Sequence, residues 1–142
     1  MAHKLFLVIF LILANSFFVA SEFAMVKVRK TRLEQMISEG NSIAKVALDL
    51  VENINEMLAT AQLGITLASV ALGWVGAKTI ESILLPVIDW IIPFESTAFC
   101  TLLTFIISFT IITFLELLVG EQLPKCASLQ NTEKAALMVA RP

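Results

Sequence analysis

Histidine, cysteine and charge are scarce in this sequence. Of its 142 residues, one is a histidine, two are cysteines, and only 15% are charged. His3 stands at the extreme N-terminus, and Cys100 and Cys126 lie far apart along the chain, so these residues do not form a spaced set of metal ligands. We interpret both cysteines as free thiols. Because the chain also lacks a nucleophile–base pair and an HExxH-type spacing, we expect no catalytic residue, no cofactor-binding residue and no enzyme activity.

Apolar residues, in contrast, are abundant. They account for 58% of the chain, and the mean hydropathy is +0.87. Soluble domains have about 45–50% apolar and 25% charged residues, so this composition is that of a membrane protein whose main partner is the lipid bilayer. The net charge of −2, with basic residues dispersed along the chain, gives no reason to expect a nucleic-acid partner.

Three apolar segments are long enough to cross a membrane as helices: Leu5–Val26, Met57–Ala77 and Thr97–Val119. The first would rise about 33 Å as a helix, against roughly 30 Å of hydrocarbon. Its beginning also has the outline of a secretory signal peptide, with Lys4, an apolar core and a small residue at Ala14. The apolar character continues past Ala14 and stops at "KVRKTR", which favours a membrane span.

A fourth apolar segment, Ile83–Phe94, is interrupted by Pro86, Asp89 and Pro93. Proline removes a helical hydrogen bond, and the segment is short for a membrane crossing. We therefore expect an interfacial or re-entrant hairpin between the second and third spans.

Basic residues follow the first and the third spans, whereas the connection between the second and third spans is mainly acidic. The positive-inside rule places segments rich in lysine and arginine in the cytoplasm. We expect a multi-pass protein of the cell (inner or plasma) membrane, with its N-terminus outside and both basic segments inside.

The link from Val28 to Ile54 has a pattern of its own. Apolar residues recur there at helical spacing with charges between them, and "EGNS" (Glu39–Ser42) supplies a glycine stop followed by an Asn or Ser start. We expect two short amphipathic helices. They could lie along the inner membrane surface or form a soluble hairpin that contacts a domain outside this chain.

Small residues recur along the second span. The pairs Gly64–Ala68 and Gly73–Ala77 have the small-xxx-small spacing that lets helix backbones approach closely in lipid. This span should be a contact helix, either within one subunit or across a dimer.

The third span ends awkwardly in "FLELLVGEQLPKCASLQ" (Phe114–Gln130). Pro124 has no N–H, so the carbonyl of Gly120 loses its helical donor at membrane depth. Glu121 adds a carboxylate beside it, and Glu116 lies one turn back on roughly the same face. We expect a broken helix, which is tolerated at this depth where it is buried in protein or lines a polar cavity.

Polar residues also interrupt the first span: Asn15, Ser16, Ser21 and Glu22. Ser21 and Glu22 should lie at a depth similar to that of Gly120. Hydroxyl, carbonyl and carboxylate oxygens together suit a hard cation. The alternative is a purely structural role, in which Glu121 and Lys125 form an i, i+4 ion pair and Ser21 bonds its own helix backbone.

Three stretches in order resemble one known family: "FFVASEFAMVKVRKTRLEQM" (Phe17–Met36), "LATAQLGITLASVALGWVG" (Leu58–Gly76) and "GEQLPKCASLQNTEKAAL" (Gly120–Leu137). They are similar to the transmembrane domain of the CNNM/CorC family of magnesium transporters, whose bacterial members are often labelled hemolysin-like. The resemblance covers nearly the whole chain. It implies an all-α integral membrane domain with three spans and juxtamembrane helices that forms a homodimer and carries Mg²⁺ between the spans.

The resemblance also implies an ion site. In the family, a first-span serine and the glycine carbonyl at the break of the third span take part in it, and these match Ser21 and Gly120. Many members have a ligand Asn where this sequence has Ile65, and close bacterial relatives usually have a His in place of Glu116. The expected metal-site residues are Ser21, Thr66, Glu116, Gly120 and Glu121.

Two functions follow from the resemblance. The first is transport, with efflux as the expected direction, of Mg²⁺ or another divalent cation. The alternative is a non-transporting membrane anchor and dimerisation module for cytoplasmic CBS domains, which Ile65 in place of the ligand Asn favours. Family members continue into a further helix and two CBS domains that bind adenine nucleotide. We interpret this chain, which ends at "VARP", as truncated before them.

Overall fold

The computed structural model describes residues 2–91 and 97–142. These residues form α1 (Ala2–Lys27), α2 (Lys30–Ser38), α3 (Ser42–Glu52), α4 (Ile54–Ile91), α5 (Thr97–Leu115), the π-helix η1 (Glu116–Gln122), α6 (Leu123–Gln130) and α7 (Thr132–Ala140). No strand occurs within these two ranges. The predicted all-α class is confirmed.

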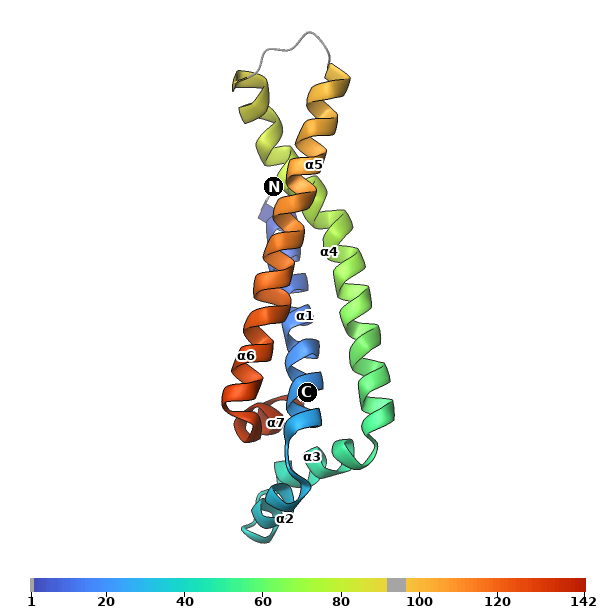
Figure 1. Ribbon diagram of the computed structural model, residues 1–142, viewed down its shortest axis with the longest axis vertical. Coiled ribbons are helices and arrows are strands. Elements are labelled where there is room, and N and C mark those ends of the chain that lie inside the picture. Colours follow the sequence, from blue (N-terminus) through green and yellow to red (C-terminus); the bar gives the residue numbers. More distant parts are fainter. Residues whose placement is uncertain (1, 92–96) are drawn as a thin grey trace.

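Three stretches of the structure are long and apolar enough to cross a membrane: His3–Lys27, Ile54–Ile88 and Ala98–Gln130. They correspond to α1, to most of α4, and to α5 continued through η1 into α6. Figure 1 shows them running along the long axis of the molecule, with α2, α3 and α7 gathered at one end. The three-span membrane architecture predicted from the sequence is therefore confirmed.

The connection between the second and third spans differs from the prediction. α4 has 38 residues, with Pro86 inside the helix, and is about 57 Å long. The hairpin expected over Ile83–Phe94 is wrong for residues up to Ile91, because these residues continue the helix α4. Residues 92–96 lie outside the described part. A single proline removes one backbone bond from a helix that keeps its ladder on both sides, so α4 continues. Beyond the N-terminus of α1, the ends of α4 and α5 diverge (Figure 1).

Small residues on α4 provide its contacts with the other two spans. A Cβ added at Gly64 would lie 2.6 Å from the ring of Phe18 on α1, and one added at Gly76 would meet the side chain of Ile112 on α5. At Gly73 it would meet nothing within 4 Å. The sequence left open whether this helix packs within one subunit or across a dimer. The structure shows contacts of the first kind, within one chain.

A separate apolar core joins the short helices to the end of α1. Its buried residues are Ala24, Met25, Val28, Leu33, Ala44, Ala47, Val51, Ala136 and Ala140. α2 and α3 meet at Gly40, whose φ of +92° favours glycine. Asn41 Oδ1 then accepts the N–H groups of Ile43 and Ala44 and caps α3. The two predicted amphipathic helices are present, and their apolar faces pack on α1 and on α7, which belongs to this same chain.

The contact at Gly64 can be tested with a matched glycine on the same helix. Gly64→Leu should lower the melting temperature in detergent, at a cost of about 1–3 kcal/mol, because the new side chain must displace the Phe18 ring. Gly73→Leu adds the same bulk in open space and should change stability by less than about 0.5 kcal/mol. Equal melting temperatures for the two variants would show that α1 and α4 do not pack at Gly64.

Candidate ion site between α1 and the π-helix

Asn15 is a buried polar residue in the middle of the apolar helix α1. It is 0% exposed, and neither its Oδ1 nor its Nδ2 has a hydrogen-bond partner in the structure. Burying an amide without a partner costs about 1–3 kcal/mol by mutational measures, and bilayer hydrocarbon offers no compensating water. This amide is therefore a candidate ligand at the centre of the membrane-spanning part.

Gly120 on η1 faces this amide. A Cβ added to Gly120 would lie only 2.9 Å from Asn15 Nδ2 and 3.6 Å from Glu116 Cγ. Any larger residue at position 120 would push the two helices apart or displace the amide. Gly120 is itself buried, so an amide, a glycine backbone and a glutamate stem come together here.

The helix around Gly120 is wider than an α-helix. The N–H of Leu123 bonds the carbonyl of Leu118, five residues back. The predicted break is wrong, because Pro124 lies in the first turn of α6, where its missing N–H is tolerated. The same missing N–H deprives the Gly120 carbonyl of its α-helical donor. π turns of this kind are frequent at functional sites.

Among the described residues, two side-chain hydrogen bonds join α1 to the third span, both at positions of α1 that follow Asn15. Ser16 Oγ donates to the carbonyl oxygen of Val119 at 2.9 Å. Ser128 Oγ, on the buried face of α6, donates to the carbonyl oxygen of Ala20 at 3.2 Å. Together they hold η1 and α6 against α1.

Ser21 lies on a different side of α1. Its hydroxyl donates to its own helix, to the carbonyl oxygen of Phe17 at 2.8 Å, but it keeps lone pairs that could accept or coordinate. Ser21 lines an open pocket of about 520 Å³ together with Asp49, Asn53 and Glu56 from α3 and the α3–α4 junction. No hydrogen bond among the described residues joins Ser21 to η1.

The other predicted site residues differ in how close they lie to the Asn15–Gly120 contact. Glu116 is half-buried beside Gly120. Glu121 forms an i, i+4 ion pair with Lys125, with 3.1 Å between Oε2 and Nζ, so the ion pair weighed as an alternative is present. Thr66 is exposed on α4 and donates to the carbonyl oxygen of Gln62 at 2.8 Å. The structure brings Gly120 and Glu116 together and leaves Thr66 apart from them.

Carboxylates do not cluster around this site. Within the described ranges, no group of three His, Cys, Asp or Glu side chains could hold a metal ion. A cation here would meet mainly neutral oxygens, from an amide, hydroxyls and backbone carbonyls, with Glu116 as the nearest charge. Oxygen donors of this kind suit hard cations such as Mg²⁺ and Ca²⁺.

The sequence prediction of the ligands did not include Asn15, and it did not consider Ser108. Ser108 on α5 is also 0% exposed, and its Oγ has no partner. The available signal was the position of each residue, since an Asn or Ser inside an apolar span needs a partner that the helix itself does not always supply.

Comparisons with known proteins agree with this architecture. The family model described as the cyclin M transmembrane N-terminal domain, CNNM, matches residues 6–142. The chain belongs to the CNNM transmembrane-domain family. It is 40% identical over 98% of its length to UPF0053 protein YhdP and 39% identical over 98% to UPF0053 protein YugS, both from Bacillus subtilis. It is 38% identical over 96% to UPF0053 protein sll0260 from Synechocystis.

These relatives are longer than the chain. The CNNM domain described here covers 31% of YhdP, 32% of YugS and 30% of sll0260. The chain therefore spans about a third of the length of these relatives.

The Asn15–Gly120 contact of this CNNM domain can be tested by a double-mutant cycle. Gly120→Ala should destabilise the wild-type chain by about 1–3 kcal/mol, because its methyl group meets the buried amide. In the Asn15→Ala background the same change should be neutral or stabilising, since the obstacle is gone and alanine favours helix over glycine by about 1 kcal/mol. The measurement is thermal unfolding in detergent. Identical costs in both backgrounds would mean that the two residues do not touch.

Proposed function

We propose that this domain moves Mg²⁺, or a similar divalent cation, across the membrane through a site between α1 and η1. The observation that carries the proposal is the buried Asn15 amide, which has no protein partner and lies against the glycine of a π turn. The cost of burying this amide without a hydrogen-bond partner is explained if the amide binds a cation that is present only part of the time. Asn15 Oδ1, the Gly120 carbonyl and Glu116 would supply oxygens to the ion. Of the further ligands expected from the sequence, Ser21 lines a neighbouring pocket, Thr66 bonds its own helix and Glu121 is paired with Lys125, so we leave these three out of the proposed ligand set.

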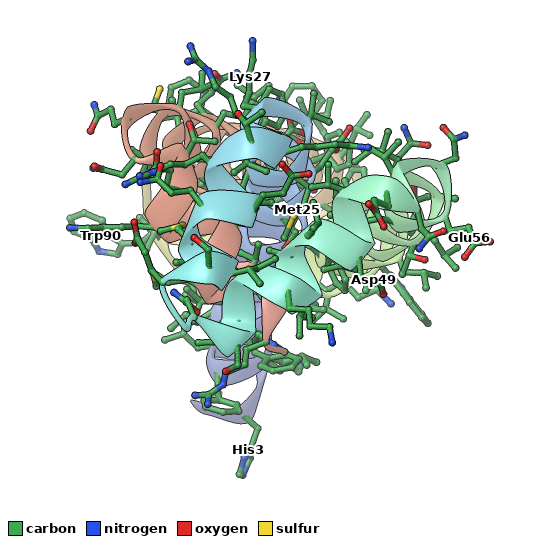
Figure 2. The ribbon with its side chains drawn as sticks, turned by 90° about the horizontal axis from the view of Figure 1, so that it is seen from below. His3, Met25, Lys27, Asp49, Glu56 and Trp90 are labelled. Carbon is green, nitrogen blue, oxygen red and sulfur yellow. The ribbon has the colours of Figure 1, made fainter. Side chains whose placement is uncertain are left out.

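The pocket beside Ser21 supports an ion route to this site. Asp49 and Glu56 line it against one basic side chain, Arg141, so its side-chain charge is net negative. Figure 2 places Asp49 and Glu56 toward one side of the molecule and Lys27 at another. A negative pocket raises the local concentration of cations, so this face is suited to receive or release them. Efflux is the direction we propose.

A second function is favoured by other observations. Glu121 is already paired with Lys125, Ile65 stands where the ligand Asn of many relatives is expected, and carboxylates do not cluster at the site in the described residues. These features would suit a membrane anchor that forms a homodimer and holds cytoplasmic CBS domains without carrying ions. Mg²⁺ flux into liposomes, measured with a longer protein that includes those domains, separates the two functions, since an anchor gives no flux above that of empty vesicles.

Cation binding can be tested directly on this chain. Mg²⁺ should raise the melting temperature of the wild-type protein, and Asn15→Leu should abolish that rise. Without Mg²⁺, Asn15→Leu should melt at the same temperature or higher, because it removes an unpartnered buried amide.

The matched control is Ser108→Ala, which removes the second buried side chain that lacks a hydrogen-bond partner among the described residues and lies on a different helix, α5. This variant should keep the full response to Mg²⁺. A normal Mg²⁺ response in Asn15→Leu would exclude Asn15 as a ligand.

The orientation proposed for a cell (inner or plasma) membrane has its own test. Cysteines introduced at Ser82 and at Ser38, both exposed, would be labelled in intact cells with a membrane-impermeant thiol reagent, in a background lacking Cys100 and Cys126. We expect labelling at position 82 and none at position 38, because basic residues hold their segments in the cytoplasm. The reverse pattern would place the N-terminus inside.

A further inference from the structure

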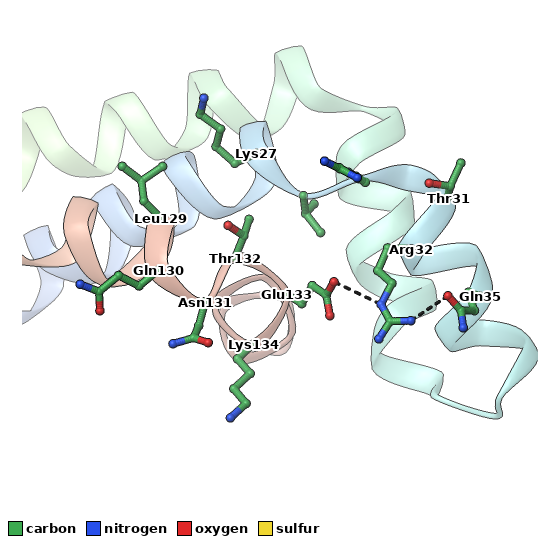
Figure 3. Close-up of a pocket in the computed structure, with 12 residues that line it drawn as sticks. Lys27, Thr31, Arg32, Gln35, Leu129, Gln130, Asn131, Thr132, Glu133 and Lys134 are labelled. Carbon is green, nitrogen blue, oxygen red and sulfur yellow. Dashed lines mark hydrogen bonds and ion pairs between the residues drawn. The ribbon is translucent and has the colours of Figure 1, made fainter.

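A second pocket, of about 720 Å³, lies where two pairs of helices meet. One wall is the α1–α2 junction, including Lys27, Arg29 and Arg32, and the other is the α6–α7 junction, including Gln130 and Lys134. Figure 3 shows this pocket with its lining side chains. It does not include any residue of the proposed ion site.

The charge of this pocket is strongly positive. Four basic residues line it against one acidic residue, Glu133. Arg32 is engaged, since its Nε donates to Glu133 Oε1 at 3.1 Å and its Nη1 donates to Gln35 Oε1 at 2.7 Å (Figure 3). Lys27, Arg29 and Lys134 form no ion pair among the described residues. Three cations are therefore left to attract an anion.

The backbone adds to this positive potential. α2 and α7, nine residues each, both begin in the pocket wall, and neither has a side-chain cap on its first N–H groups. A helix N-terminus carries a partial positive charge and free donors, which favour phosphate and carboxylate groups. The two helix starts and the three unpaired cations share one pocket.

The position of the pocket relative to the ends of the membrane spans indicates the source of its ligand. The first and third spans end at Lys27 and Gln130, and both residues line the pocket. The pocket therefore lies at the boundary where the apolar spans meet the lipid headgroups. Leu129, 49% exposed, adds an apolar side chain to the lining on the membrane side of Gln130. An anion with an attached acyl chain would meet both surfaces at once.

We propose that this pocket binds a phosphate-bearing anion, with the headgroup of an anionic phospholipid as its source. Lys27 and Arg29 contact the phosphate from the α1–α2 side, Lys134 contacts it from α7, and the acyl chains lie along the ends of the spans. Arg32, held by Glu133 and Gln35, keeps the two walls together.

The experiment measures thermal protection of the purified chain in detergent by short-chain phosphatidylglycerol, with phosphatidylcholine of the same chain length as the neutral reference. We expect phosphatidylglycerol to raise the melting temperature more than phosphatidylcholine does. Lys27→Gln/Arg29→Gln should weaken its apparent affinity by about fivefold for each charge removed. Lys30→Gln/Lys45→Gln removes the same charge from exposed positions outside the pocket and should leave the affinity unchanged.

A second variant and a second probe complete the test. Lys134→Gln reaches the pocket from a different helix, so its loss of about fivefold is measurable even if the α1–α2 variant does not fold. Inorganic phosphate, added without lipid, separates the two sources. If it protects at the same concentration as phosphatidylglycerol, the pocket takes a soluble phosphate compound, and the lipid source is overturned. Equal protection by the two lipids, or equal losses in pocket and control variants, would overturn the site altogether.

Discussion

The approach of α1 to η1 at Asn15 and Gly120 is the constraint on which the membrane part of this structure depends. In lipid, helices gain little from hydrophobic burial against each other, so packing and interhelical hydrogen bonds must hold them. Here a glycine permits the approach, and Ser16 and Ser128 secure it with bonds to backbone carbonyls of the facing helix. α4 then packs on the outside of this pair through Gly64 and Gly76.

The short helices divide the opposite charges of the chain between two pockets. α1, α2, α3 and α7 share one apolar core, so their positions are tied to the C-terminal ends of the first and third spans. Asp49 and Glu56 outnumber Arg141 in one pocket, and four basic residues outnumber Glu133 in the other, so the two pockets have opposite net charge. If both proposals hold, a cation and a phosphate group would approach the same end of the bundle at separate surfaces.

Much of this fold could be predicted from the sequence because its determinants are local. Apolar length indicated the spans, and Gly40 with Asn41 marked the turn and cap between α2 and α3. Pro86 and Pro124 misled the prediction, since a proline weakens a helix by one bond but does not end it where the rest of the ladder continues. The ligand set was less predictable. Asn15 and Gly120 are far apart in the sequence but lie against each other in the structure. Residue types alone do not indicate which faces of two helices meet.

The polar interior of α1 has a meaning that stability alone does not explain. A leucine at position 15 would have the same branched shape, with a somewhat larger volume, and would leave no donor or acceptor unpartnered. Hydrogen bonding does not account for the asparagine either, since the two bonds that secure α1 to the third span come from Ser16 and Ser128. What Asn15 adds is oxygen at the place where Pro124 removes the α-helical donor of the Gly120 carbonyl and Glu116 stands nearby. These groups have in common that each can serve as a ligand of a hard cation, which is why, among the described residues, the buried amide gives the most direct support to the proposed ion binding.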